Sequence, residues 1–149
     1  MKTLHDILKQ AESMRFATDC GTDMHRKLQR VIVSSDFTAG DSGLVQRIIT
    51  RPDLIPFFCD AAQTEVPIAG TANGRFISRR VDRLVVNKQN KTVLVLDYKT
   101  DRDSSVCRDK YVAQIKEYID LLRAVYPEYV ISGYILWTYD FSLEKIHTK

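Results

Sequence analysis

The stretch that most constrains this chain is Val93-Leu94-Val95-Leu96-Asp97-Tyr98-Lys99-Thr100. Its first four residues are apolar and rich in β-branched side chains, which predicts a buried strand. Because side chains on a strand alternate between faces, we expect Asp97 and Lys99 on the same face, roughly 7 Å apart. A buried strand that ends in an acid and an amine is a poor core element, but it suits a site for a metal ion and an attacking water.

The length of 149 residues fits a single domain with a real hydrophobic core. Hydrophobic residues make up 44% and charged residues 28%, which is typical of a soluble globular domain. We expect neither a membrane span nor a secretory signal. Cys20, Cys59 and Cys107 lie far apart in the chain, which predicts neither a zinc site nor a disulfide framework and favours a reducing, cytoplasmic compartment.

The apolar pattern predicts helices first and a sheet afterwards. A first amphipathic helix is expected from an apolar stripe of Leu4, Ile7, Leu8, Ala11 and Met14. It is expected to end at Gly21-Thr22-Asp23, which has the composition of a stop followed by an N-cap. Further helices are expected over 24–32, 44–49, 54–61 and 107–126, and strands over 65–69, 76–86, 93–100, 130–137 and 144–147. This order predicts an α/β fold with a central mixed β-sheet flanked by helices, in which N-terminal helices precede a three-strand meander.

A second carboxylate, Asp82, falls inside the expected strand that precedes Asp97. Neighbouring antiparallel strands lie about 5 Å apart, so the two carboxylates can meet if the register allows it. Two carboxylates at one point repel each other unless a cation lies between them, and hard oxygen ligands suit Mg²⁺ or Mn²⁺. The alternative is a surface ion pair of Asp82 with Arg80 or Arg83.

Three other side chains fit a site of this kind. Lys99 can orient a metal-bound water or neutralise charge on a phosphate, although an ion pair with Asp97 or Asp101 is the simpler alternative. Gln114 and Tyr118 are four residues apart and share one helix face, where they can hold a phosphate or a base. Core packing is the alternative for Tyr118.

Two further residues remain open between a functional and a structural role. His25 is expected in the first turn of the helix over 24–32, where the positive end of the helix dipole disfavours protonation and keeps the imidazole available as a ligand. Glu65 lies near the start of the first expected strand.

Basic residues concentrate in one part of the chain, although 22 Lys and Arg against 19 Asp and Glu give a net charge of only +3. A basic face around a few carboxylates suits a polyanionic substrate, and a solvated surface is the ordinary alternative. The basic residues of this stretch are Arg75, Arg79, Arg80, Arg83, Lys88, Lys91, Lys99, Arg102, Arg108, Lys110 and Lys116.

Five short motifs occur in a fixed order along the chain. They are Gly21-Thr22-Asp23-Met24-His25-Arg26-Lys27-Leu28, Glu65-Val66-Pro67, Val81-Asp82-Arg83-Leu84, Leu96-Asp97-Tyr98-Lys99-Thr100 and Tyr111-Val112-Ala113-Gln114-Ile115-Lys116-Glu117-Tyr118. Together they resemble the RecB-type nuclease domain of the PD-(D/E)XK superfamily, in particular the C-terminal nuclease of AddA and RecB helicase–nuclease subunits. The resemblance spans roughly residues 21–137 and implies a restriction-endonuclease-like core.

The resemblance implies a role for each matching residue of the metal centre. His25, Asp82 and Asp97 would be side-chain metal ligands, and the backbone carbonyl of Tyr98 would be a further ligand. Lys99 would be the catalytic lysine, acting with Asp82 and Asp97.

The resemblance also implies the substrate. Gln114 and Tyr118 match the family's Q-x-x-x-Y motif, which is associated with DNA engagement, and Glu65 matches an acidic position with an auxiliary role. The implied reaction is hydrolysis of DNA phosphodiester bonds to 5′-phosphate and 3′-hydroxyl products, with Mg²⁺ as cofactor and Mn²⁺ as a substitute.

Two absences from the sequence bear on the partners. The trailing cysteine group of some relatives is missing, which predicts no iron–sulfur cluster, and no G-x-x-x-x-G-K-[ST] loop is present. We therefore expect residues 1–149 to form one nuclease domain, part of or partner to an ATP-dependent helicase, that degrades single-stranded DNA as an exonuclease in recombinational repair. The alternatives are a DNA-binding scaffold module without chemistry and a stand-alone endonuclease.

Overall fold

The computed structural model describes residues 3–101 and 104–148, and it describes side chains for all of these except 10–22 and 104–106. The elements in chain order are α1 (Leu4–Gln29), β1 (Ile32–Val33), β2 (Thr38–Ala39), α2 (Ser42–Ile49), the 3₁₀ turn η1 (Ile55–Phe57), β3 (Gln63–Ala72), β4 (Arg75–Asn87), β5 (Thr92–Lys99), α3 (Ser104–Val125), β6 (Val130–Trp137) and β7 (Ser142–Ile146).

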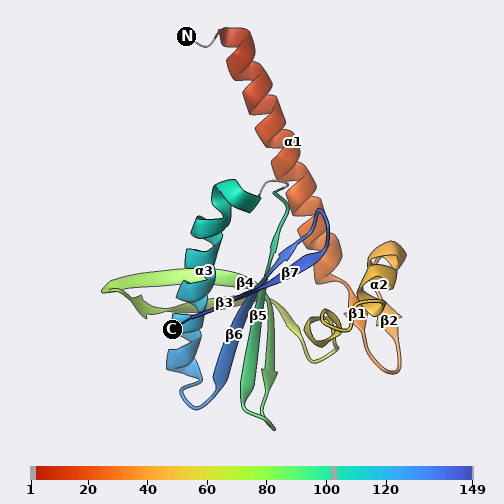
Figure 1. Cartoon of the computed structure of the whole chain (residues 1–149), viewed down its shortest axis with the longest axis vertical. Helices are drawn as coiled ribbons and strands as arrows, with labels where there is room; N and C mark the ends of the chain where they lie inside the picture. The colour runs from red at the N-terminus through yellow and green to blue at the C-terminus, as the bar shows by residue number, and fades with distance from the viewer. Residues whose placement is uncertain (1–2, 102–103, 149) are drawn as a thin grey trace.

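A five-stranded sheet in the order β3-β4-β5-β6-β7 forms the centre of the molecule (Figure 1). Strands β5 and β6 are parallel, because the chain returns through α3, and every other neighbouring pair of this sheet is antiparallel. Strands β1 and β2 form a separate antiparallel pair. The predicted α/β class, the mixed sheet and the three-strand meander are confirmed, and the arrangement is consistent with a restriction-endonuclease-like core.

Each face of the sheet is covered by its own hydrophobic layer. On one face, α3 packs its apolar stripe, including Ile115 and Ile119, on Val93 and Val95 of β5. On the other face, the C-terminal end of α1, α2 and η1 pack on Leu96 and neighbouring side chains. The sheet is therefore the middle layer of a sandwich, and residues at the ends of its strands lie between two helical layers.

The N-terminal helix differs from its prediction. α1 runs without interruption from Leu4 to Gln29, so the expected stop at Gly21 and the separate helix over 24–32 are wrong, and Ile32 lies in β1. A single glycine inside a helix costs only about 1 kcal/mol relative to alanine, which is too little to end a helix whose later turns are anchored by tertiary contacts. His25 therefore lies near the C-terminal end of a long helix.

The first part of α1 extends away from the sheet (Figure 1). The apolar side chains Leu4, Ile7 and Leu8 are exposed there and do not belong to either core layer. Of the stripe predicted for this helix, the side chains of Ala11 and Met14 lie outside the described ones. Within the described residues, no helix combines the length and apolar content needed to cross a membrane.

The other elements agree with the predicted pattern more closely. α2 and α3 are confirmed, and so are all five strands, each with extended or shifted bounds. The helix expected over 54–61 is only the three-residue turn η1. The β1–β2 pair was not predicted, because two-residue strands are too short to show an alternating pattern.

The packing of α3 on β6 provides a test of the fold. A Cβ atom at Gly133 would lie 2.3 Å from Cγ2 of Ile115 and 2.9 Å from Cδ1 of Ile119. We expect Gly133→Ala to lower the free energy of unfolding by about 1–3 kcal/mol in urea titrations, because the added methyl overpacks this contact. The cost of Gly133→Ala should be smaller when Ile115 is already alanine, and equal costs in both backgrounds would contradict the contact.

Candidate active site

Asp82 lies at a point where β4 changes which face its side chains point to. Val81 belongs to the hydrophobic layer beneath α3, whereas Arg83 lies on the opposite face with its guanidinium 4.1 Å from the ring centroid of Phe58. In a regular strand, residues two apart share one face, so the alternation breaks at Asp82. The break leaves Asp82 between the two helical layers.

The position opposite Asp82 on β3 is Glu65, and the pairs on either side of it keep the same register. Glu65 has a φ of 53°, in the left-handed region. Such a conformation costs a non-glycine residue of order 1–3 kcal/mol and tends to occur at functional sites. The carboxylate of Glu65 lies 3.9 Å from Nη1 of Arg80, so this predicted auxiliary residue contacts a basic side chain, and its described contacts do not include Asp82 or Asp97.

The Asp82 carboxylate connects α1 to β5. Its Oδ2 accepts a hydrogen bond from the backbone N–H of Tyr98 at 2.8 Å and lies 3.4 Å from Nε2 of His25. The His25 ring also meets the Tyr98 ring edge-on, with 5.3 Å between centroids. The structure thus brings His25 to the predicted site, but from the C-terminal end of α1, so the argument from the positive end of a helix dipole does not apply.

Asp97 and Asp82 meet as the sequence predicts, and the proximity shows in their proton affinities. Burial and the adjacent Asp82 carboxylate raise the pKa of Asp97 to about 7, against the opposing effect of Lys99. Burial also disfavours the charged form of Asp82, but hydrogen bonds from His25, from protonated Asp97 and from the Tyr98 amide outweigh it and hold the pKa of Asp82 below its ordinary value. One proton therefore stabilises the pair.

Lys99 lies on the same face as Asp97, as predicted, with Nζ 2.7 Å from Asp97 Oδ2. This is a close charge contact at angles that do not make a hydrogen bond, and Oδ2 is buried without a hydrogen-bond partner among the described residues. The ammonium donates instead to Oε1 of Gln114 at 3.0 Å and lies 4.3 Å from the ring centroid of Tyr111. The ion pair of Lys99 with Asp97, one of the two alternatives left open by the sequence, is present. An ion pair of Lys99 with Asp101 is not among the described contacts. The Asp101 carboxylate instead accepts a hydrogen bond from the hydroxyl of Tyr111.

The helix pair Gln114 and Tyr118 continues from Lys99. Nε2 of Gln114 donates to the hydroxyl of Tyr118 at 2.7 Å. Tyr118 is buried in the layer beneath α3, and burial raises the pKa of its hydroxyl. Core packing, the alternative for Tyr118, is confirmed for its ring, and its hydroxyl contacts Gln114. A role of the pair in holding a phosphate or a base stays a prediction.

The three predicted side-chain ligands form a chain of contacts centred on Asp82. Within the described part of the molecule, no three His, Cys, Asp or Glu side chains converge on one point that could hold a metal ion. The chemistry of the set nevertheless fits Mg²⁺ or Mn²⁺, because two carboxylates share a buried position that a cation would stabilise, and Asp97 Oδ2 has an ion-pair contact with Lys99 but no hydrogen bond. His25, Asp82 and Asp97 are the residues that would hold such an ion, and the role of the Tyr98 carbonyl stays a prediction.

Arg83 is the residue that the sequence analysis missed. It is 1% exposed, and within the described residues no carboxylate lies within 4.0 Å of it. The guanidinium donates to the Tyr98 hydroxyl (2.6 Å) and to the carbonyl oxygens of Leu28 (2.7 Å), Gln29 (3.4 Å), Val31 (2.8 Å) and Phe57 (3.1 Å). The surface ion pair of Asp82 with Arg80 or Arg83 is therefore wrong. The available signal was an arginine directly before Leu84, in the apolar second half of β4.

The basic stretch does not form a single face. Arg83 is buried, Lys99 belongs to the carboxylate cluster, and Lys91 pairs with Glu128 in the turns at the far end of the strands. Arg75 and its neighbours Arg79 and Arg80 are exposed on the β3–β4 hairpin.

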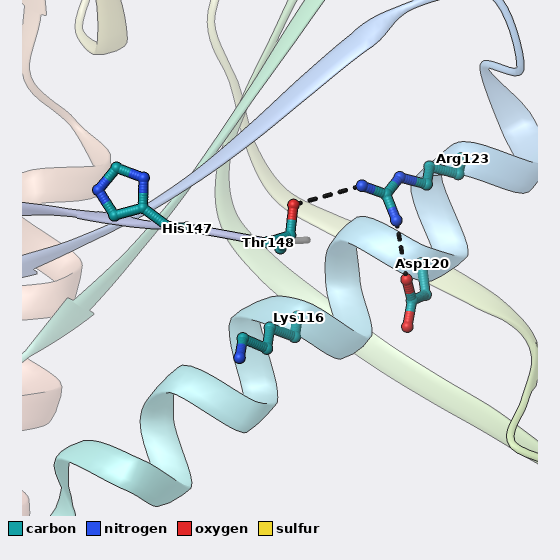
Figure 2. Close-up of a pocket in the computed structure, with 5 residues that line it drawn as sticks. All are labelled: Lys116, Asp120, Arg123, His147 and Thr148. Atoms are coloured by element: carbon teal, nitrogen blue, oxygen red, sulfur yellow. Dashed lines mark hydrogen bonds and ion pairs between the residues drawn. The ribbon is translucent and has the colours of Figure 1, made fainter.

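A cavity of about 460 Å³ lies apart from the carboxylate cluster. It is lined by Lys116, Asp120, Arg123, His147 and Thr148, contributed by α3 and the C-terminal segment (Figure 2). Arg123 lies 3.4 Å from the Asp120 carboxylate and donates to the Thr148 hydroxyl at 3.3 Å. The predicted site residues do not line this cavity.

Of the three cysteines, Cys59 and Cys107 are free thiols, and the side chain of Cys20 lies outside the described ones.

Comparisons with known proteins do not assign this chain to a family. No family model matches the chain, and no curated protein matches it. Among solved structures, the crystal structure of SSO0001 is similar to 70% of this chain, at 18% sequence identity and a TM-score of 0.41. The chain covers 46% of SSO0001.

The buried guanidinium provides a test of how the site is held together. We expect Arg83→Lys to lower the free energy of unfolding by about 2–4 kcal/mol, because lysine lacks the planar fork and leaves buried carbonyl oxygens unsatisfied. The neighbouring Arg80→Lys is the matched control and should stay within about 0.5 kcal/mol, since that side chain is exposed. Equal urea midpoints for the two variants would show that the Arg83 hydrogen bonds contribute no stability.

The carboxylate pair predicts a pH dependence in the absence of divalent cations. Folding raises the pKa of Asp97 from its ordinary 3.8 to about 7, so between these values the folded chain binds more protons than the unfolded chain. The free energy of unfolding contributed by Asp97 is therefore fully present below about pH 4 and is lost as the pH rises through about 7. The lowered pKa of Asp82 acts in the opposite sense and only below its ordinary value.

Urea titrations in EDTA across this range measure the effect. Asp97→Asn should remove most of the decline, because the amide carries no titrating proton. A wild-type stability that does not fall between pH 4 and 7, or an unchanged slope in Asp97→Asn, would contradict the assignment.

Proposed function

We propose that this chain is a metal-dependent deoxyribonuclease domain that hydrolyses phosphodiester bonds of DNA. The observation that carries the proposal is the buried pair of Asp82 and Asp97, brought together from adjacent strands with Lys99 beside it. A fold that needed only a core would avoid two mutually repelling carboxylates at a buried position. The ordered motifs that resemble RecB-type nucleases support the same conclusion.

The residues of the cluster would have different chemical roles. Asp82, Asp97 and His25 would hold Mg²⁺, which when bound lowers the pKa of water and polarises the phosphate. Lys99 faces the same space and would neutralise charge that develops on the phosphate oxygens. Gln114 and Tyr118 hold the Lys99 ammonium in place through two consecutive hydrogen bonds, and they would act as positioning residues for it.

The finer proposal is an exonuclease that degrades single-stranded DNA together with an ATP-dependent helicase in recombinational repair. It rests on the resemblance to the nuclease of AddA and RecB subunits. A stand-alone endonuclease would cut closed circular DNA as readily as linear DNA, whereas an exonuclease requires an end, so the two substrates separate these functions.

A catalytically silent DNA-binding module is the second candidate. It is favoured by the direct Lys99–Asp97 contact, which neutralises part of the site without a metal ion. Titration calorimetry with Mn²⁺ discriminates the two, since a nuclease should take up the ion in a manner that depends on Asp97 and a silent module should not.

Substitution of the cluster tests the nuclease directly. We expect Asp97→Asn and Lys99→Ala each to lower the rate of Mg²⁺-dependent cleavage of linear DNA by at least about 100-fold, because each removes a charge that acts on the reacting phosphate. Release of acid-soluble nucleotides measures the rate, and EDTA should abolish it.

The control is Lys91→Ala, which breaks an exposed ion pair with Glu128 at the opposite end of the strands and should leave cleavage unchanged. Loss of folding does not explain an inactive Asp97→Asn, because that variant removes the carboxylate repulsion. Full activity in either cluster variant would overturn the proposal.

A further inference from the structure

The hairpin of β3 and β4 has an uncovered face that leads to the carboxylate cluster. Residues 75–82 of β4 lie beyond the part of the strand that pairs with β5, so here β3 and β4 form a two-stranded extension. Figure 1 shows this arm reaching past α3. Ile77 and Val81 point into the layer beneath α3, so Phe76, Ser78 and Arg80 point to the opposite face.

That opposite face is exposed along its length. Phe76 is 75% exposed, the largest value among the exposed large hydrophobic side chains, and the Arg80 side chain is 68% exposed. Their register partners on β3 are Thr71 opposite Phe76, Ala69 opposite Ser78, and Pro67 opposite Arg80. We call these six residues the hairpin face. Small partners leave the phenyl ring free to take a second planar group.

We propose that the hairpin face binds single-stranded DNA, with a base stacked on Phe76 and a phosphate held by Arg80. The proposal rests on the proposed nuclease function and names the path by which its substrate reaches the site. An exposed aromatic ring beside a guanidinium on a β-surface is the arrangement by which proteins hold unpaired nucleotides, since every base offers a π-face and every linkage a negative charge.

The charges around the hairpin face favour DNA over a protein partner. Arg80 is the cation of this face, and its one described acidic contact is Glu65, at 3.9 Å, which is long for an ion pair. Apart from Phe76, the face carries small or polar side chains, whereas the core of a protein interface needs a larger apolar area. A polyanion with flat apolar bases matches this composition.

The position of the hairpin face fits a substrate path. Arg80 precedes Asp82 by two residues, about 7 Å along β4, and Phe76 precedes it by six, about 20 Å. A strand of DNA that lies along the face therefore runs toward Asp82, and the contacts at Phe76 affect its binding without touching the reacting phosphate.

Fluorescence anisotropy with a labelled single-stranded oligonucleotide in EDTA tests the proposal, because no cleavage occurs there. We expect Phe76→Ala to weaken binding about 5- to 100-fold, as loss of one stacked base does, and Phe76→Trp to retain it. Phe37→Ala is the matched control, since Phe37 is a half-exposed phenylalanine in the β1–β2 loop, and it should bind as the wild type does. Arg80→Ala should reduce the slope of log affinity against log salt by about 0.7, the loss of one phosphate contact on a single strand.

Binding of a blunt-ended duplex provides a second measurement, because its paired bases cannot stack on Phe76. Phe76→Ala should weaken single-strand binding while leaving duplex binding unchanged. Wild-type affinity of Phe76→Ala for the single strand would overturn the proposal and would point to another occupant of the face, as would failure of the wild-type chain to bind the oligonucleotide.

The outcome is separable from that of the nuclease proposal. If Asp97→Asn cuts DNA normally while Phe76→Ala binds it poorly, the nuclease assignment fails and the hairpin face stands. If Asp97→Asn is inactive while Phe76→Ala has the wild-type KM and Kd, the hairpin face is wrong and the nuclease assignment stands.

Discussion

The buried guanidinium of Arg83 holds the parts of this molecule in their relative positions. It donates to carbonyl oxygens at the C-terminal end of α1 and in η1, and to the hydroxyl of Tyr98 on β5. The last carbonyl groups of a helix have no partner within the helix and carry the negative end of its dipole, so a cation is suited to satisfy them. Because His25 precedes these carbonyls by one turn, the same contact sets the distance between His25 and Asp82.

Two opposite electrostatic requirements lie side by side in β4. Arg83 is a buried cation that is satisfied by neutral oxygens, and Asp82 is a nearly buried anion beside a second carboxylate. The break in alternation at Asp82, opposite the left-handed backbone of Glu65, directs Val81 and Arg83 to different layers. In a regular strand, the two residues adjoining Asp82 would share one layer, and Arg83 could not reach the end of α1.

The sequence predicted those features that depend on local alternation and on short connections. The meeting of Asp82 and Asp97 followed from two consecutive strands joined by a tight turn, because such a turn leaves little freedom in the register. The break expected at Gly21 was wrong, because tertiary contacts at the end of α1 outweigh the weak preference of one glycine against helix. The role of Arg83 could not be predicted, since most of its partners are backbone oxygens, three of them more than 50 residues away. A backbone oxygen is present at every residue, so the identity of these partners leaves no pattern in the sequence.

The position of Lys99 depends on how α3 is seated on the sheet. Gln114 accepts from the Lys99 ammonium and is itself held by Tyr118, and the next residue, Ile115, packs over the bare backbone of Gly133 on β6. Because β5 and β6 are parallel neighbours, a glycine on β6 lets α3 approach the strand that carries Asp97 and Lys99. The close approach of helix and sheet is therefore a condition for the amine to stand beside the carboxylate pair, which links a packing detail of the core to the charge balance of the candidate site.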